Sequence, residues 1–311
     1  MTVRYVEVKE EEIGQRLDNY LLRILKGVPK SHVYRIIRAG EVRINKKRAQ
    51  PSTRLCLGDN VRIPPVRMSV GKDIVVSAGL GQYLLASIIY EDDLWLVINK
   101  PTGIAVHGGS GLSLGVIEAL RTLRGDLSYL ELVHRLDKET SGCLVLAKKR
   151  SALRALHELL AKRLVNKTYW ALLDKPWQGK KSVTVDAALE KNTGQSGERF
   201  VRISEEGKSS QTTFKLLENF SNACLVEATP KTGRTHQIRV HSLHLGHPII
   251  GDEKYGIDLQ TEGITKENYR LYLHARAIQF TLNDKTYSFQ AVLDERFSST
   301  LKQLRSLVVR D

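Results

Sequence analysis

The sequence predicts an α+β protein, in which a mixed, largely antiparallel sheet with flanking helices follows a small basic module. Strand patterns outnumber helical patterns, and the two do not alternate as they do in β-α-β units. Connections between neighbouring strand patterns are short, which favours antiparallel pairing. The chain has 311 residues, of which 41% are hydrophobic and 26% are charged. This is enough for one large core and one smaller one.

The N-terminal module is expected to span residues 13–67. Apolar residues recur with helical period over 13–25, and Ser31 is expected to cap a second helix that ends at Gly40. Short strands should follow, with a turn at Asn45–Lys46. A linker over 68–88 then leads into the main domain, 89–311.

The formal net charge of +14 is concentrated in this module. Residues 13–67 hold thirteen Lys or Arg and three Asp or Glu, a net charge of +10. A basic protein need not bind anything, but charge gathered in one short segment is typical of a nucleic-acid footprint. The basic residues expected to make contacts there are Lys30, Arg35, Arg38, Arg43, Lys46, Lys47 and Arg48.

Cysteine usage and hydropathy indicate a cytoplasmic protein. Cys56, Cys143 and Cys224 are far apart, so they form neither a disulfide framework nor a CxxC metal motif. The first residues are acidic and lack the apolar stretch of a signal peptide. Since no run of about 18 apolar residues occurs, no membrane span is expected.

In the main domain, strand-loop-strand and helix patterns follow one another. Residues 131–150 read as two strands with Asp137 in the loop between them, and a helix capped by Ser151 should follow. Tyr169 is expected on a strand. Helical spacing returns after Thr232–Gly233 and ends at Gly246.

The stretch HRLDKETSG, residues 134–142, sets the carboxylate of Asp137 among cationic side chains. A second cluster, TGRTHQIR, residues 232–239, carries Arg234 and Arg239. A buried aspartate paired with arginine stays ionised, with its pKa lowered by roughly 1–3 units. Such a carboxylate can serve as a nucleophile or a base, or the ion pair can be purely structural.

Three other chemistries fit the residues less well. GLSLG places Ser113 in a G-x-S-x-G pattern, but a glycine-rich loop precedes it where a hydrolase needs a strand, so Ser113 is expected to cap a helix. His236, His241, His244 and His247 are spread around a helix, and no metal is expected. A glycosidase pair with Asp137 would require a remote acid such as Asp186 or Glu227.

These motifs resemble those of the ribosomal-RNA pseudouridine synthase superfamily of the large-subunit "A" type. The resemblance covers nearly the whole chain and rests on INKPTGIAVHGGSG, HRLDKETSG, KTYWALL, TGRTHQIRVH, LGHPIIGDEKYG and LHARAIQF. The basic segment 13–67 looks like the α-L RNA-binding module of ribosomal protein S-four type. The resemblance therefore implies a twisted, largely antiparallel catalytic sheet behind an RNA-binding module.

The resemblance implies an isomerase that converts uridine in large-subunit ribosomal RNA to pseudouridine without metal or cofactor. Asp137 matches the essential aspartate, and Arg239 would pair with it. Tyr169 matches the tyrosine that stacks on the target base and helps to remove the ring proton, and Ile238 would form an apolar wall. Arg135 would fill the space that the flipped nucleotide leaves in the RNA stack.

His134, Arg234 and His236 are expected to bind phosphate or to position other groups. A monomer is expected. Two alternatives stay open: a pseudouridine synthase that acts on transfer RNA, and a non-catalytic RNA-binding or ribosome-assembly protein in which the Asp137–Arg239 pair is structural.

Overall fold

The computed structural model divides the chain into two compact units, Met1–Val75 and Val76–Asp311. The structure describes residues 2–25, 27–66, 75–108, 114–193, 199–256 and 264–308. None of the helices in these ranges is both long and apolar enough to cross a bilayer. The predicted α+β class is confirmed, with a four-stranded sheet in the first unit and a ten-stranded sheet in the second.

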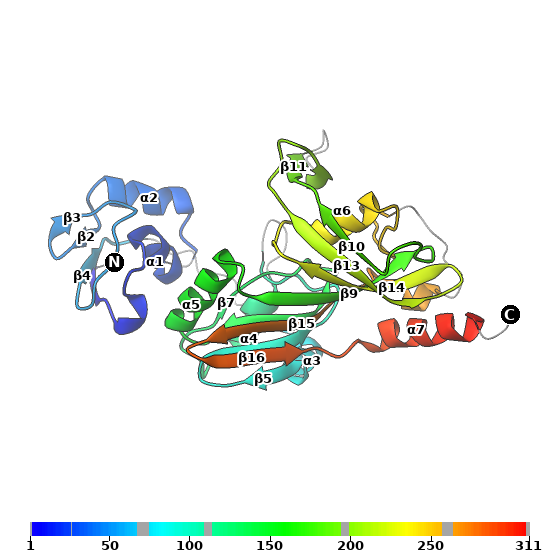
Figure 1. Ribbon diagram of the computed structural model, residues 1–311. Helices are drawn as coiled ribbons and strands as arrows, with labels where there is room; N and C mark the ends of the chain where they lie inside the picture. Colours follow the sequence, from blue (N-terminus) through cyan, green and yellow to red (C-terminus); the bar gives the residue numbers. More distant parts are fainter. Residues whose placement is uncertain are drawn as a thin grey trace. The chain divides into compact units, whose positions relative to one another are not determined.

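The N-terminal unit packs two helices against one face of a small sheet (Figure 1). The apolar face of α2 contributes Val33, Ile36 and Ile37 to a core that also contains Val61 and Ile63. The sheet order is β1-β4-β2-β3, with antiparallel neighbours throughout. The elements are β1 (Arg4–Glu7), η1 (Glu10–Glu12), α1 (Leu17–Ile24), α2 (Lys30–Arg38), β2 (Arg43–Ile44), β3 (Lys47–Arg48) and β4 (Asn60–Ile63).

The large sheet has the order β10-β13-β14-β9-β15-β8-β6-β5, with β16 paired to β15 and β7 to β8. Its neighbours are antiparallel except for β15 and β8, which confirms the mixed, largely antiparallel prediction. The strands are β5 (Ile88–Glu91), β6 (Trp95–Lys100), β7 (Glu131–Leu132), β8 (Ser141–Ala147), β9 (Asn166–Asp174), β10 (Ser182–Asp186), β13 (Gln211–Asn219), β14 (Ala223–Pro230), β15 (Leu273–Leu282) and β16 (Lys285–Gln290).

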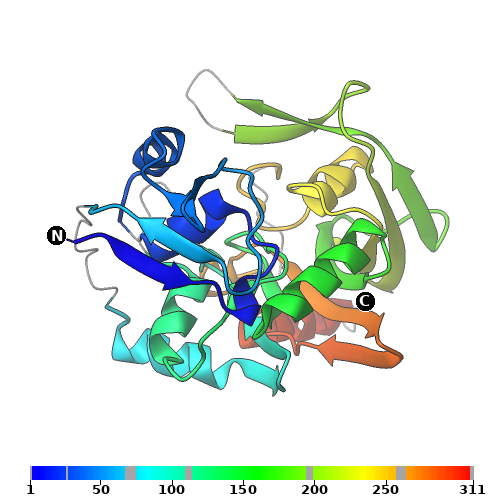
Figure 2. The ribbon, with the colours of Figure 1, turned by 90° about the vertical axis from the view of Figure 1, so that its left-hand side faces the viewer.

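Helices cover both faces of this sheet, and a separate hairpin projects from it. Helices α3 (Ala78–Ala86) and α4 (Val116–Leu123) pack on one face of β6 and β8, and α5 (Arg150–Ala161) packs on the other. Helices α6 (Gln237–His244) and α7 (Glu295–Val308) pack at the β9–β14 end, and η2 is Lys266–Asn268. The hairpin of β11 (Leu189–Thr193) and β12 (Arg199–Ile203) stands away from the sheet in both ribbon views (Figures 1 and 2).

The structure corrects several local expectations. Ser31 and Ser151 do not cap helices, because the N-cap positions of α2 and α5 are Pro29 and Lys149. Ser113 lies outside the described residues. Helix α3 occupies part of the segment 68–88 that was expected to be a linker; its sequence AGLGQYLLA contains two glycines, which weaken a helical pattern.

The parallel contact between β8 and β15 anchors the chain that follows the Asp137 loop. His274 lies opposite Ser141, and Ala275 lies opposite Gly142. Gly142 has φ of +110°, and a Cβ at this position would lie 2.3 Å from the carbonyl oxygen of Ala275. The backbones of β8 and β15 can therefore approach this closely only because residue 142 is glycine.

A buried polar network lies at the same junction. Arg270 Nη2 donates to Ser141 Oγ at 2.8 Å, and Ser141 Oγ lies 2.8 Å from His274 Nδ1. His274 is fully buried, and its Nε2 lies 3.2 Å from the carbonyl oxygen of Ala291. Burial lowers the pKa of His274 to about 4, so the ring is neutral at neutral pH.

We expect Gly142→Ala to lower the free energy of unfolding by about 3 kcal/mol, because the new methyl group meets the Ala275 backbone at a φ that alanine disfavours. Urea denaturation measures this. Gly125→Ala is the matched control, because a Cβ there meets nothing within 4 Å. Equal stability of the two variants would contradict the tight contact between β8 and β15.

We also expect His274 to make stability depend on pH. Its pKa lies near 4 in the folded chain and near the ordinary histidine pKa of 6.5 in the unfolded chain, so only the unfolded chain takes up a proton between these values. This contribution to stability is full above pH 6.5 and falls as the pH drops toward 4, by about 3 kcal/mol in all. Urea denaturation at pH 7 and pH 5 should show a smaller difference for His274→Gln than for the wild type; an unchanged difference would refute this.

Candidate active site

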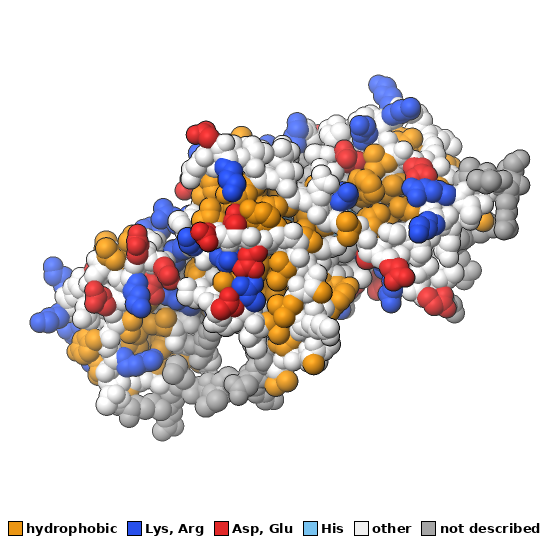
Figure 3. Space-filling model, turned by 90° about the horizontal axis from the view of Figure 1, so that it is seen from below, with side chains coloured by type: hydrophobic (Ala, Val, Ile, Leu, Met, Phe, Trp, Pro, Cys, Tyr) orange, Lys and Arg blue, Asp and Glu red, His pale blue; other side chains and the backbone are white. Residues whose placement is uncertain are grey.

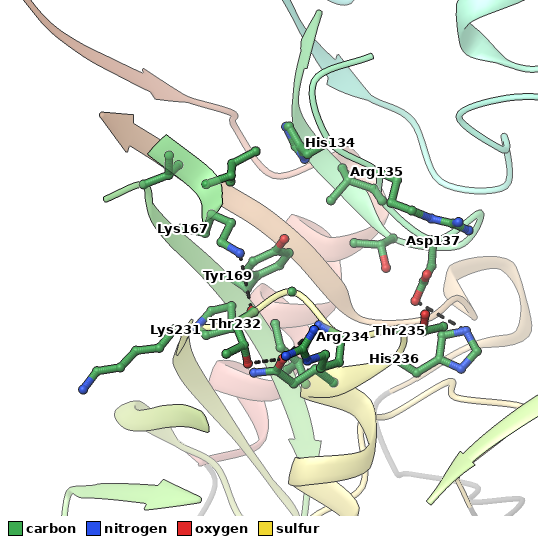
Figure 4. A pocket seen from close by; sticks show the side chains of 18 of the residues that line it. His134, Arg135, Asp137, Lys167, Tyr169, Lys231, Thr232, Arg234, Thr235 and His236 are labelled. Carbon is green, nitrogen blue, oxygen red and sulfur yellow. Dashed lines mark hydrogen bonds and ion pairs between the residues drawn. The ribbon is translucent and has the colours of Figure 1, made fainter. Parts of the chain in front are cut away.

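A pocket of about 560 Å³ lies beside the Asp137 loop, and all eight site residues expected in the main domain line it (Figure 4). The loop before β8, strand β9, the turn after β14 and the start of α6 form its walls. Asp137 is the one acid among the described residues that line it, whereas the basic ones are Arg135, Arg163, Lys167, Lys231, Arg234 and Arg239. The pocket therefore suits a polyanion and presents one carboxylate to it.

Asp137 lies next to two cationic or ionisable side chains that come from α6 and the residue before it. Its Oδ2 is 3.6 Å from Arg239 Nη1 and 3.7 Å from His236 Nε2. The carboxylate is 24% exposed, so it remains open to the pocket. Asp137 and Arg239 are thus brought together, but as a loose contact and not as a bidentate pair.

The bidentate partner of Arg239 is Asp252. Arg239 Nε and Nη2 each donate to the Asp252 carboxylate at 2.7 Å, and the Asp252 side chain is fully buried. Because this pair fixes the plane of the guanidinium, the remaining Nη1 is held toward Asp137. The carboxylate of Asp252 raises the pKa of Arg239 against the opposing effect of burial.

Asp252 also organises a turn that supports His236. It accepts hydrogen bonds from the backbone N–H groups of Lys254 and Tyr255, each at 3.0 Å. The Tyr255 ring lies under the Arg239 guanidinium, 5.0 Å from it, and the Tyr255 hydroxyl is 2.7 Å from His236 Nδ1. That hydroxyl accepts the N–H of Val201 from β12, so the projecting hairpin connects to the pocket. His236 itself has a left-handed φ of 53°.

Tyr169 and Lys167 project from β9 into the pocket, facing the Asp137 side (Figure 4). Burial raises the pKa of the Tyr169 phenol, and the charge of Asp137 adds to this, so the phenol is protonated at neutral pH. It offers an aromatic face and an O–H donor. Burial lowers the pKa of Lys167, whose Nζ lies 3.4 Å from the carbonyl oxygen of Thr232.

The remaining site residues differ in how firmly they are held. His134 Nε2 accepts the Val145 N–H at 3.1 Å, and burial lowers its pKa to about 4, so it positions the loop as a neutral ring. Ile238 is buried. Arg234 Nε donates to the carbonyl oxygen of Ser209 at 3.2 Å. Arg135 is exposed, and its side chain forms no hydrogen bond or ion pair with the described part of the chain.

A buried lysine anchors the loop from behind. Lys100 is fully buried, and its Nζ donates to the carbonyl oxygens of Pro101, Ile104 and Lys138 at 2.7–3.0 Å. Burial lowers the pKa of Lys100 to about 7. The Gly103 N–H also donates to Lys138, and Thr102 Oγ1 donates to Glu139. The segment after β6 thereby holds the backbone on both sides of the Lys138–Glu139 bond.

The seven basic residues of the N-terminal unit that were predicted to contact RNA lie on α2 and on the β2–β3 hairpin. Lys30 and Arg38 each lie 5.9 Å from the Tyr34 ring, and Arg35 Nη2 lies 3.2 Å from His32 Nε2. Arg43, Lys46, Lys47 and Arg48 are exposed along the hairpin. Figure 3 shows one side of the molecule on which acidic and basic side chains are interspersed with apolar groups, so the charge is not gathered there.

The glycosidase alternative is not supported by the geometry of the site. Neither Asp186 nor Glu227 lines the pocket around Asp137, and Glu139 is half exposed and pairs with Lys138. His241 is buried against Thr212 and Ser210. Within the described ranges, no three His, Cys, Asp or Glu side chains are grouped as metal ligands would be.

Asp252, Tyr255 and Lys100 have structural roles at this site that sequence reasoning did not assign. All three lie in the quoted motifs GDEKYG and INKP, but spacing alone does not show which partners they meet. Lys100, directly before a proline at a strand end, reads like any surface lysine.

Comparisons with known proteins agree with this fold and this pocket. A family model described as RNA pseudouridylate synthase matches residues 94–244, and an S4 domain model matches residues 15–61. The chain belongs to the RNA pseudouridylate synthase family, which is a family of isomerases. The family resemblance and the prediction of an isomerase are therefore confirmed.

Relatives match almost the whole chain. The "Ribosomal large subunit pseudouridine synthase C" of Haemophilus influenzae is 52% identical over 98% of this chain and 96% of its own length. The protein of the same name from Escherichia coli is 52% identical over 98% of both chains. Among solved structures, "Human RNA Pseudouridylate Synthase Domain Containing 4" has a TM-score of 0.61 at 30% identity, covering 73% of this chain and 96% of that one.

We expect Asp252→Asn to lower the free energy of unfolding by about 3–5 kcal/mol, because it leaves a buried guanidinium without its counter-charge. The matched control is Glu218→Gln, which removes an equally bidentate carboxylate from the exposed Arg305 and should cost less than about 1 kcal/mol. Urea denaturation of both variants distinguishes them. Similar losses of unfolding free energy in the two variants would show that the buried Arg239–Asp252 pair stabilises the fold no more than an exposed ion pair does.

Proposed function

We propose that this protein converts uridines of large-subunit ribosomal RNA to pseudouridine, with Asp137 as the essential carboxylate. The observation that carries the proposal is the pocket with a single carboxylate, faced by an aromatic ring and surrounded by cations. The printed names of the relatives at 52% identity support large-subunit ribosomal RNA as the substrate.

The reaction needs no redox partner, because it only exchanges bonds within one nucleotide. The bond between N1 of the uracil and C1′ of the ribose breaks, the base rotates in the pocket, and a bond from C5 to C1′ forms. The proton lost from C5 balances the proton gained at N1. Asp137 can attack the sugar, attack the base ring or remove a proton, and Arg239 Nη1 keeps its charge oriented in each case.

Tyr169 is proposed to stack on the detached base and to direct its O–H toward it. Because the pKa of the phenol is raised, its first contribution at neutral pH is an aromatic face and a hydrogen-bond donor. Removal of the C5 proton by this group would require the phenolate, a form that burial and the charge of Asp137 disfavour. Ile238 supplies an apolar wall on the other side.

The target uridine must leave its stack to reach Asp137, at a cost of about a few kcal/mol. Arg135 lies exposed on the loop that carries Asp137 and lines the same pocket. Its planar guanidinium can therefore take the place in the RNA stack that the flipped uridine leaves. Arg234 and His236 are proposed to meet phosphate or to position the carboxylate.

We assign RNA affinity to residues 13–67 and catalysis to residues 89–311. Residues 68–88 connect these two parts. A concentrated basic module supplies binding that weakens as salt is added, and the pocket reads local RNA shape. A monomer in the bacterial cytoplasm is sufficient for this activity, because every group used comes from one chain.

We expect Asp137→Asn to abolish pseudouridine formation while RNA affinity changes by less than about twofold, since the amide keeps the shape and loses the charge. Release of tritium from C5-labelled uridine in unmodified ribosomal RNA measures turnover, and transfer RNA serves as the competing substrate. Glu139→Gln, two residues away and half exposed, is the matched control and should remain active. Full turnover by Asp137→Asn would refute the assignment.

The non-catalytic alternative makes a different prediction for stability. If the contact with Arg239 were purely structural, Asp137→Ala should cost several kcal/mol. Because the main partner of Arg239 is Asp252 and Asp137 is partly exposed, we expect a loss of about 1 kcal/mol or less.

A further inference from the structure

The small sheet of the N-terminal unit carries a row of side chains that the proposed function does not use. The strand register places Tyr5 of β1 opposite Arg62 of β4, Arg62 opposite Arg43 of β2, and Arg43 opposite Arg48 of β3. Directly opposed residues point to the same face of a sheet. One aromatic ring and three guanidinium groups therefore cross all four strands on one face.

This face points away from the core of the unit. The alternate residues Val6, Val61 and Ile44 pair with one another and pack against the helices. Tyr5 is 65% exposed, whereas Val61 is fully buried. An exposed aromatic residue beside three arginines has no packing role that would explain it.

The face is hollowed as well as charged. A hollow of about 1060 Å³ is lined by Tyr5, Arg43 and Arg62 together with Lys46, Asn45 and Asn60. Glu41 is the one acidic residue among the described residues that line it. Lys46 stands on the β2–β3 turn with a left-handed φ of 68°, which presents it at the rim.

A structural explanation exists for part of the row. Arg48, Arg43 and Arg62 donate to the carbonyl oxygens of residues 39, 40 and 41 at 3.0, 3.3 and 2.6 Å, and these carbonyls follow the end of α2. Cations stabilise a helix C-terminus. However, each guanidinium has five N–H donors, and none of the three forms an ion pair with a carboxylate in the described ranges. Most of their donors remain available.

Like charges placed directly opposite each other on a sheet destabilise it. The Arg62–Arg43–Arg48 row therefore carries electrostatic repulsion between neighbouring guanidinium groups. A polyanion bound across the strands would relieve this repulsion. A ring at the end of the row suits an unpaired base, since ring stacking and a basic groove together bind single-stranded RNA.

We propose that this sheet face binds a single-stranded segment of the RNA substrate. Arg43, Arg62 and Lys46 contact successive phosphates, and an unpaired base stacks on Tyr5. This deepens the proposed function, from which the RNA class of the partner is taken. Tyr5 and Arg62 are the residues that it adds to the basic residues of α2 and the β2–β3 hairpin.

The test measures binding of the full-length chain to a fluorescein-labelled ten-nucleotide oligoadenylate, which offers no uracil to the catalytic pocket. Anisotropy should show about tenfold weaker binding for Tyr5→Ala and less than a twofold change for Tyr5→Phe, which keeps the ring. Arg62→Ala should weaken binding and reduce the slope of log affinity against log salt by about 0.7, the value for one phosphate contact on a single strand.

Two matched controls separate this face from general effects. Arg4→Ala removes the same charge from β1, at a position that pairs with the buried Ile63 and so belongs to the other face. Tyr83→Ala removes an exposed tyrosine, 57% accessible, from α3 of the larger unit. Both variants should bind like the wild type.

Unchanged affinity and salt slope in Tyr5→Ala and Arg62→Ala would overturn the proposal. If these variants bound RNA normally but no longer bound the assembled large subunit, the face would belong to a ribosomal protein, and the RNA proposal would again be overturned. Neither result depends on turnover, so a failure here leaves the assignment of Asp137 intact. Failure of the wild type to form pseudouridine would not alter this binding result.

Discussion

The buried ion pair between Arg239 and Asp252 is the interaction on which the geometry of the pocket around Asp137 depends. Asp252 accepts hydrogen bonds from two of the three guanidinium nitrogens of Arg239, and the third nitrogen, Nη1, is directed at Asp137. The same carboxylate holds the backbone N–H of Tyr255, whose hydroxyl meets His236. A carboxylate that does not line the pocket thus places both groups beside Asp137, whose own carboxylate remains accessible.

The proposed function gives the cations and the two other groups of the pocket different tasks. Under that proposal the cations meet RNA phosphates, and the chemistry falls to the Asp137 carboxylate and the protonated Tyr169 phenol. Lys100 and His134 hold the loop through hydrogen bonds with backbone groups. Because their pKa values are low, they can do this with less buried charge than two ordinary cations would bring.

Much of the fold could be predicted because its signals are local. The loop that carries Asp137 follows from two flanking strand patterns, and the start of α6 follows from helical spacing after a turn. Asp252 could not be identified in the same way, because it lies 13 residues beyond Arg239 and reaches it through a turn set by tertiary packing. Charge alone does not distinguish Asp252 from other acids, such as Asp186 and Glu227, as the partner of Arg239. Helix α3 was missed because two glycines obscure its pattern.

The glycine contact between β8 and β15 has a consequence for the order in which the protein folds. The loop before β8 is complete early in the chain, yet Gly142 and Ser141 find their neighbours on Ala275 and Arg270. During synthesis, the backbone after the Asp137 loop cannot make this contact until residues 270–275 have left the ribosome. A chain truncated before β15 would therefore lack the contacts that anchor the backbone after the Asp137 loop.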